Sequence, residues 1–427
     1  MMSGPIDQAQ NRWSSAFAIL LAAVAVLPLG LAFSVGPLPL IHFVVALAVA
    51  VAVMARIASG RAPWRWHPSA TWLLVLLVIY LMSTMAARDP VVALRTVFIA
   101  TLGAALAMTV RSICSAAGRW RILIAVLVSV GLLVSVFGFA TSGSIETQAS
   151  GASALTGRAV GVFTDPNQLG TFSAVMVMIA WALALAATTW PLRLLGFLCA
   201  GLSAASLLVS FSRGAWMGAA VAAIPLIVVT FRYHPKWSLR ITALLVGVGV
   251  PVAAVFAPQM WTLVTGRLLS ILEPGSNPND NRPFIYREAY RQILERPLLG
   301  QGPGNFTLES ITADRVGTAV EAAHAHNLFL QVASEAGIVA AFALLAFGVG
   351  LAWRAWRMRA AVSRSDAALA LGLICAIVAV AVQGMVDYTL GNPILYYLVW
   401  IVLGALMAIT QPSRGSEHHC VNERIRL

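Results

Sequence analysis

Charged residues are scarce in this chain. Only 10% of its 427 residues are Asp, Glu, Lys or Arg, whereas 59% are hydrophobic. A soluble domain typically carries about 25% charged residues, so this composition excludes one. The hydrophobic residues form runs of about 20, the length that an α-helix needs to cross a bilayer. The sequence therefore predicts an all-α polytopic membrane protein.

Cysteines and metal-binding motifs are scarce as well. The four cysteines fall within predicted spans or on the predicted cytoplasmic side, so we expect no disulfide. No H-E-x-x-H sequence occurs, and no D-x-D sequence lies at the predicted outer surface. These absences predict a protein that uses no metal and no cofactor.

About twelve apolar segments of spanning length follow one another along the chain. They lie near 15–34, 38–55, 70–87, 91–110, 120–140, 168–188, 192–210, 214–231, 239–258, 332–353, 366–387 and 390–410. Arginines collect in alternate connections and near both ends, which by the positive-inside rule places both termini in the cytoplasm. We therefore attribute the formal charge of +12 to arginines that set the orientation of the protein in the membrane, and we expect no nucleic-acid partner.

The chain is expected to form a single integral membrane domain over residues 1–427, with one large periplasmic loop over 259–331 between spans nine and ten. Within this loop, FIYREAYRQILER has the spacing of a short amphipathic helix, with Phe284, Ile285, Ala289 and Ile293 on one face. The sequence PLLGQGPGNF that follows would end the helix.

Unusual polar residues gather at the predicted outer ends of the spans. They are Arg158 and Asn167 near span six, Arg213 at span eight, Arg282 and Arg287 in the large loop, His324, His326 and Asn327 before span ten, Asp387 after span eleven, and Arg95 about one turn inside span four. Polar groups are costly in a bilayer, so a set at one depth predicts an extracytoplasmic binding or active site.

This set of residues indicates a particular chemistry. Several arginines without matching carboxylates favour a phosphate or diphosphate ligand, because the guanidinium group binds phosphate oxygens bidentately. An unperturbed histidine titrates near pH 6.5 and can accept a proton from a hydroxyl group. Together they predict transfer of a group from a phosphorylated, membrane-borne donor to an alcohol.

Other interpretations of single residues stay open at this point. His326 could be an interfacial histidine bonded to a backbone carbonyl, and Asp387 could be a counter-ion for an arginine. Either Arg282 or Arg287 could face the ligand. A metal site with His324 is disfavoured, because two residues at i and i+2 diverge on a helix. The polar stripe that runs from Asn327 to Glu335 is expected to face the protein interior, where it either orients neighbouring groups or serves interhelical hydrogen bonding alone.

Four sequence blocks resemble one family. HNLFLQVASEAG, SFSRGAW, NRPFIYREAYRQILERPLLGQGPGNF and GRAVGVFTDPNQLG are similar to the recurring motifs of the superfamily of O-antigen ligases, O-antigen polymerases and bacterial O-oligosaccharyltransferases. Two positions depart from the family pattern: Ala340 replaces a glycine, and Tyr286 stands where tryptophan is expected.

The resemblance implies a glycosyltransferase of the bacterial inner membrane, with its active site on the periplasmic side. Its donor would be a glycan linked to a polyprenyl diphosphate, and its acceptor a hydroxyl group of lipid A-core. By this resemblance Arg213 and Arg282 hold the diphosphate, His326 is the general base, and direct attack by the acceptor inverts the anomeric carbon. The remaining polar residues of the set would bind substrate.

Three alternatives to a ligase share parts of this pattern. An O-antigen polymerase and a protein O-oligosaccharyltransferase would use the same donor with another acceptor. The short segment after the last span favours the ligase over the oligosaccharyltransferase. A non-catalytic transporter of a polyprenyl-linked glycan is disfavoured, because it would place polar residues toward both faces of the membrane.

Overall fold

The computed structural model describes most of the chain as helices. The described residues are 5–35, 38–115, 118–141, 158–233, 281–306, 324–358 and 362–410, with the short pieces 146–147, 155–156, 265–266, 269, 311–312 and 319–320. In this part of the chain eight helices are long and apolar enough to cross a membrane, which supports the predicted polytopic membrane protein.

The eight long helices have the following bounds. They are α2 (Leu40–Ile57), α4 (Pro90–Cys114), α5 (Arg119–Ala140), α6 (Pro166–Ala186), α7 (Trp190–Val209), α8 (Arg213–Tyr233), α13 (Ile338–Met358) and α14 (Arg364–Gly384). Shorter apolar helices are α3 (Ala70–Thr84), α15 (Pro393–Ile409), and the end of α1 (Pro5–Val26) with the 3-10 helix Leu27–Leu31. The predicted span over 239–258 lies outside the described residues, so the total of about twelve spans stays a prediction.

The predicted tenth span, 332–353, is wrong in its first part. A short helix, α12 (Leu328–Ala336), ends at Gly337, and α13 begins at the next residue. Gly337 has a φ of +88°, and a Cβ atom at this position would lie 2.1 Å from the carbonyl oxygen of Leu298. Only glycine fits this backbone and this contact. The polar residues of α12 therefore belong to a separate helix and not to the membrane span.

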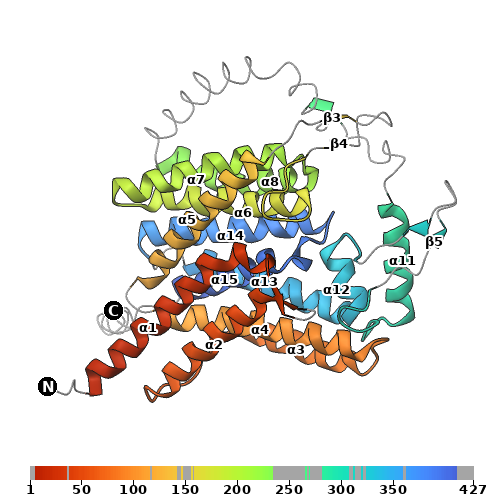
Figure 1. Ribbon diagram of the computed structural model, residues 1–427, viewed down its shortest axis with the longest axis horizontal. Coiled ribbons are helices and arrows are strands. Elements are labelled where there is room, and N and C mark those ends of the chain that lie inside the picture. The colour runs from red at the N-terminus through yellow and green to blue at the C-terminus, as the bar shows by residue number, and fades with distance from the viewer. Residues whose placement is uncertain are drawn as a thin grey trace, which may run out of the picture.

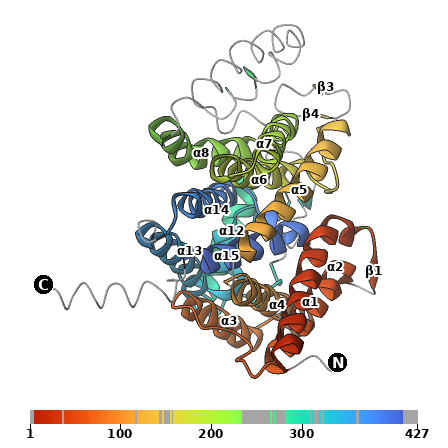
Figure 2. The same cartoon turned by 90° about the vertical axis from the view of Figure 1, so that its left-hand side faces the viewer.

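The helices form three layers that both views show. Figures 1 and 2 show α5 to α8 on one side, α13, α14 and α15 in the middle, and α1 to α4 on the other side. Helix α14 packs on α6 and α8, and α15 packs on α4. Small residues allow close approach, since a Cβ atom on Gly404 would lie 2.6 Å from Ala107 O and one on Gly218 would lie 2.6 Å from Ala379 O.

The predicted amphipathic helix is confirmed as α11 (Arg282–Glu295), which lies beside α12 at one end of the bundle (Figure 1). Ile285, Ala289 and Ile293 are buried, as expected, but Glu288 and Gln292 share the buried face. The described strands form three antiparallel pairs of two residues each: β1 (Ser34–Val35) with β2 (Leu38–Pro39), β3 (Glu146–Thr147) with β4 (Leu155–Thr156), and β5 (Ile311–Thr312) with β6 (Ala319–Val320).

Candidate functional site

The candidate site lies where the segment before α12 meets the end of α14. Asn327 caps α12, because its side-chain oxygen accepts hydrogen bonds from the backbone N–H groups of Phe329 and Leu330. Its side-chain amide donates to the carbonyl of Met385, at 2.7 Å, just after α14 ends. This single side chain therefore fixes both the start of α12 and its position against α14.

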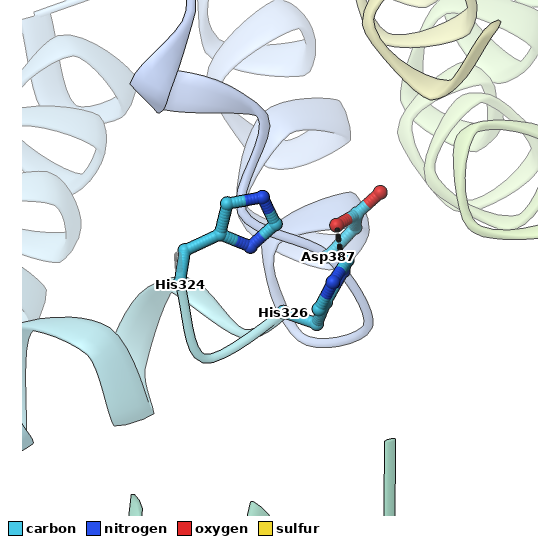
Figure 3. Close-up of side chains that lie close together, drawn as sticks. All are labelled: His324, His326 and Asp387. Carbon is cyan, nitrogen blue, oxygen red and sulfur yellow. Dashed lines mark hydrogen bonds and ion pairs between the residues drawn. The ribbon is translucent and has the colours of Figure 1, made fainter. Parts of the chain in front are cut away.

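His326 and Asp387 form a hydrogen-bonded pair across this junction (Figure 3). The Nδ1 atom of His326 lies 2.9 Å from Oδ1 of Asp387, although the two residues are 61 positions apart. The His326 side chain is 31% exposed and that of Asp387 only 7%. When Nδ1–H donates to the carboxylate, the neutral ring presents Nε2 as a proton acceptor. The pair therefore has the arrangement of a general base and the group that orients it.

The backbone at His326 is held in a strained conformation. Its φ of +46° lies in the left-handed region, which residues other than glycine rarely adopt. The Tyr286 hydroxyl donates to the His326 carbonyl at 3.2 Å, and the Gln331 side chain accepts from the Ala325 N–H at 2.6 Å. These contacts hold the backbone around His326, and such supported strain is typical of functional sites. Sequence reasoning noticed Tyr286 only as a departure from the family pattern and gave it no role.

His324 lies against His326, contrary to the expectation that the two rings diverge. Both histidines precede α12, so helical spacing does not apply, and their ring centroids are 4.2 Å apart. Burial and the neighbouring His326 lower the pKa of His324, whose Nδ1 atom is buried without a hydrogen-bond partner in the described part of the chain. Ligand atoms of His324, His326 and Asp387 lie within 4.8 Å of one another, so the group could hold a cation.

Two arginines, Arg282 and Arg158, lie within electrostatic reach of Asp387. Burial raises the pKa of Asp387, but the hydrogen bond from His326, the charge of the histidine and the charge of Arg282 outweigh it and keep the pKa below its usual value. The charges of Asp387, Arg213 and Arg282 also act on Arg158, whose pKa is lowered mainly by burial. Arg158, Arg213 and Arg282 come from three separated segments, and both Arg213 and Arg282 lie within electrostatic reach of Arg158.

Arg158 is fixed by the elements around it. Its Nε atom donates to the Ser210 carbonyl at 2.8 Å, and its terminal nitrogen donates to the Asn167 side chain at 3.1 Å. Asp165 caps α6 by accepting from the Asn167 N–H at 2.6 Å. The side chain of Asn167 therefore positions Arg158. The sequence shows Asn167 only as a residue next to a helix cap and does not reveal this role.

Arg213 is the first residue of α8 and follows a strained turn. Phe211 has a φ of +48°, a second left-handed residue at this end of the bundle. Gly214 faces α14, since a Cβ atom there would lie 2.1 Å from the Gln383 side chain. Its small size thus serves the packing of α8 on α14, which brings Arg213 to the same end as Asp387.

Two predicted site arginines lie differently. Arg287 is exposed on α11, whereas Arg282 is half-buried at the start of the same helix and its charge acts on Asp387. Arg95 is exposed on α4 and lines a cavity of about 620 Å³, together with Tyr80, Phe329 and Tyr396. The cavity is predominantly apolar and also includes Tyr388, the neighbour of Asp387.

The loop 297–306 closes over the end of α12. The N–H groups of Gln301 and Gly302 donate to the carbonyls of Ser334 and Glu335, both at 2.8 Å, and so satisfy acceptors that the helix end leaves open. The Glu335 carboxylate accepts from the side chain of Gln331 at 2.7 Å and from the Phe306 N–H at 3.4 Å. The predicted inward orientation of the polar stripe is confirmed for Gln331, Ser334 and Glu335, all of which are buried.

Glu335 gives this junction a pH dependence. Burial raises its pKa to about 7, so the folded protein holds a proton that the unfolded chain releases from about pH 4.5 upward. Stability should therefore fall as the pH rises from about 5 to about 7, by on the order of 3 kcal/mol at most. Glu335→Gln keeps the acceptor oxygen, and we expect it to flatten the dependence of the thermal unfolding midpoint on pH.

A matched control for this experiment is Glu288→Gln on α11. The hydrogen bond from Arg291 lowers the pKa of Glu288, against the opposing effect of burial, so this residue is ionised in both states throughout the same pH window. Glu288→Gln should leave the slope unchanged. A wild-type unfolding midpoint that does not fall between pH 5 and 7, or an equal slope in Glu335→Gln, would contradict the assignment.

Fold and site together define a class: a helical, multi-pass membrane protein with a histidine–aspartate pair and arginines at one end of its bundle. The family model described as O-antigen ligase matches residues 198–345, a stretch from α7 to α13 that includes Arg213, Arg282 and His326. This match confirms the resemblance to the O-antigen ligase superfamily and supports a ligase- or polymerase-like function. None of the curated proteins matches the chain.

Proposed function

We propose that this protein is a glycosyltransferase that moves an O-antigen glycan from a polyprenyl-diphosphate donor to a hydroxyl group of lipid A-core at the periplasmic face of the inner membrane. The observation that carries the proposal is the hydrogen bond from His326 to Asp387, which leaves Nε2 of an accessible imidazole as a proton acceptor, with the charges of Arg158 and Arg282 acting on Asp387. The family match over residues 198–345 supports the same substrate class.

The reaction would proceed in one displacement. The acceptor oxygen attacks the anomeric carbon of the donor sugar, its proton passes to Nε2 of His326, and the bond from the anomeric carbon to the diphosphate oxygen breaks. The Asp387 carboxylate stabilises the imidazolium that forms, because Oδ1 accepts the hydrogen bond from Nδ1. One direct attack inverts the configuration of the anomeric carbon, and it requires no enzyme nucleophile.

The arginines would bind the diphosphate. Negative charge grows on the leaving diphosphate in the transition state, and cations that are already fixed in position stabilise it best. Arg158 is held by Ser210 and Asn167, and Arg213 and Arg282 begin helices α8 and α11, so all three have defined positions. This supports a site organised for an anion before the ligand arrives.

The apolar cavity would hold the lipid part of the donor. It lies between α3, α4, α12, α13, α14 and α15 and contains Arg95 and Tyr388. A polyprenyl chain is a long hydrocarbon, and an apolar cavity that reaches the residue next to Asp387 would place its diphosphate toward the arginines. His324, Asn327 and Arg287 would assist binding at the edge of the site.

The metal-independent mechanism competes with a specific alternative. His324, His326 and Asp387 could hold a cation, in which case one ring nitrogen of His326 and a carboxylate oxygen of Asp387 would be ligands and His326 would not act as the base. We propose the base mechanism because the 2.9 Å distance from Nδ1 to Oδ1 is that of a hydrogen bond and because arginines already supply positive charge at the site.

The test is a transfer assay with the purified full chain in EDTA. The donor is a polyprenyl-diphosphate-linked glycan, and lipid A-core, a protein acceptor or a second donor molecule is offered separately. We expect modified lipid A-core. Lengthened donor glycan would identify a polymerase instead, and glycosylated protein an oligosaccharyltransferase. Activity that is lost in EDTA and restored by Mg²⁺ would overturn the metal-independent mechanism, and no transfer to any acceptor would favour a transporter.

A further inference from the structure

A second group of cationic residues lies at the other end of the bundle. Helix α4 begins beside the loop 297–306, because the Asn305 side chain accepts from the Asp89 N–H at 2.7 Å, and it ends at Cys114. Arg111 follows Asp89 by 22 residues, so it lies roughly 33 Å along the helix axis from the site end. The group is therefore distinct from the candidate active site.

Arg111 is buried among charges of its own sign. Its side chain is 3% exposed, and the charges that act on it within the described residues come from Arg65, Arg354 and Arg56. One terminal nitrogen donates to the carbonyl of Arg65, but the buried Nε–H has no acceptor in the part of the chain that the structure describes. A buried N–H donor without an acceptor is costly and rare in native proteins.

Two more donors of the same kind, on His67 and Arg354, lie within electrostatic reach of Arg111. His67 is 2% exposed, and its Nδ1 atom accepts from the Ser69 N–H at 3.2 Å. Burial and the charges of Arg111 and Arg354 lower the pKa of His67 to about 4, so the ring is neutral and Nε2 carries the proton. This Nε2–H and the Nε–H of Arg354 are also buried without acceptors among the described residues.

An orientation signal alone does not explain this burial. Arginines that only mark the cytoplasmic side would extend into water, as two neighbours do. Arg121 is 52% exposed and pairs with Asp366, and Arg357 is exposed and stacks on Trp353. Arg111, His67 and Arg354 instead keep three N–H donors buried without acceptors among the described residues, within electrostatic reach of one another, where an acceptor with negative charge would be favoured.

The surroundings indicate a lipid headgroup as the source of that acceptor. Trp64 and Trp66 are 39% and 59% exposed beside the arginines, and Trp353 and Trp356 are 59% and 51% exposed on α13. Exposed tryptophans at the ends of membrane helices typically lie at the depth of lipid headgroups. Basic pockets between helix ends at this depth bind the phosphates of anionic lipids.

We propose that Arg111, Arg354 and His67 form a binding site for the phosphate of an anionic phospholipid at the end of the bundle opposite to the histidine–aspartate pair. The phosphate oxygens accept the three buried N–H donors, and the negative charge offsets the repulsion among the arginines. The exposed Arg65 lies at the mouth of this site, and the tryptophans contact the lipid around it.

The test measures lipid binding and not transfer activity. The full chain in a non-ionic detergent is titrated with phosphatidylglycerol, with phosphatidylcholine, and with sodium phosphate, and bound lipid is followed by native mass spectrometry and by the rise of the thermal unfolding midpoint. We expect phosphatidylglycerol to bind at least about tenfold more tightly than phosphatidylcholine, since a net charge and charge-assisted hydrogen bonds are gained. Arg111→Gln and Arg354→Gln should each weaken this binding about tenfold.

Arg357→Gln is the matched control, because it removes one charge from the same end of α13 as Arg354→Gln but from an exposed side chain. It should bind phosphatidylglycerol as the wild type does. If Arg111→Gln fails to fold, the comparison of Arg354→Gln with Arg357→Gln keeps the test complete. If sodium phosphate competes with phosphatidylglycerol, the site is supported, and it also binds soluble phosphate. The proposal would be overturned if Arg354→Gln and Arg357→Gln bound phosphatidylglycerol equally tightly. It would also be overturned if the wild type bound phosphatidylglycerol no more tightly than phosphatidylcholine and phosphate had no effect.

Discussion

His326→Ala is expected to reduce glycan transfer by about a thousandfold while the protein stays folded in the membrane. The substitution removes the ring that would accept the proton of the acceptor hydroxyl, and with it the partner of Asp387. Rates with saturating donor and lipid A-core, together with the thermal unfolding midpoint, measure the loss. A variant with nearly full activity would remove His326 from the role of base.

His324→Ala separates the base mechanism from the metal alternative. In the base mechanism His324 packs against the ring of His326, with 4.2 Å between the ring centroids, and assists binding at the edge of the site without taking the proton, so its loss should cost no more than about tenfold. If both histidines are ligands of one cation, the two substitutions should cost similar amounts, and added Zn²⁺ or Mg²⁺ should change the activity of the wild type. An equal loss in both variants would therefore contradict the base mechanism.

The membrane class and the elements around the site could be predicted from the sequence, because hydrophobic runs and helical spacing are local properties. The helix α11 and the buried polar face of α12 follow from spacing alone. The break at Gly337 was missed, since a continuous apolar run hides a single backbone angle. At that angle the glycine packs against Leu298, which lies 39 positions earlier, and no local pattern shows this contact.

Pairing between distant residues could not be predicted. The sequence offered Asp387 as a counter-ion for an arginine, and the charge of Arg282 does act on it. Its hydrogen bond with His326 could not be foreseen, because it depends on Asn327, which ties the start of α12 to the residue after α14. The arrangement of His324 and His326 was predicted from the divergence of residues i and i+2 on a helix, and this spacing does not apply because both residues precede α12. The burial of Arg111 could not be predicted either, because it depends on a contact with a distant segment, the loop around Arg65 that folds over the end of α4.

Arg282→Gln is expected to lower kcat/KM for the donor by about a hundredfold, whereas Arg287→Gln should lower it less than about threefold. The two variants remove the same charge from the same helix, α11, five positions apart. Arg282 is half-buried, and its charge acts on Asp387 and Arg158, while Arg287 is exposed. Steady-state rates at varied donor concentration, with lipid A-core held saturating, would measure both values.

The split between kcat and KM tests the mechanism further. A residue that stabilises charge on the leaving diphosphate should lower kcat as well as kcat/KM, because that charge appears only in the transition state. A residue that only attracts the donor should change KM and be sensitive to salt. Arg282→Lys keeps the charge but loses the planar, bidentate contact, so we expect it to recover only part of the activity. A larger loss in Arg287→Gln than in Arg282→Gln would reverse the assignment and place the diphosphate on the exposed face of α11.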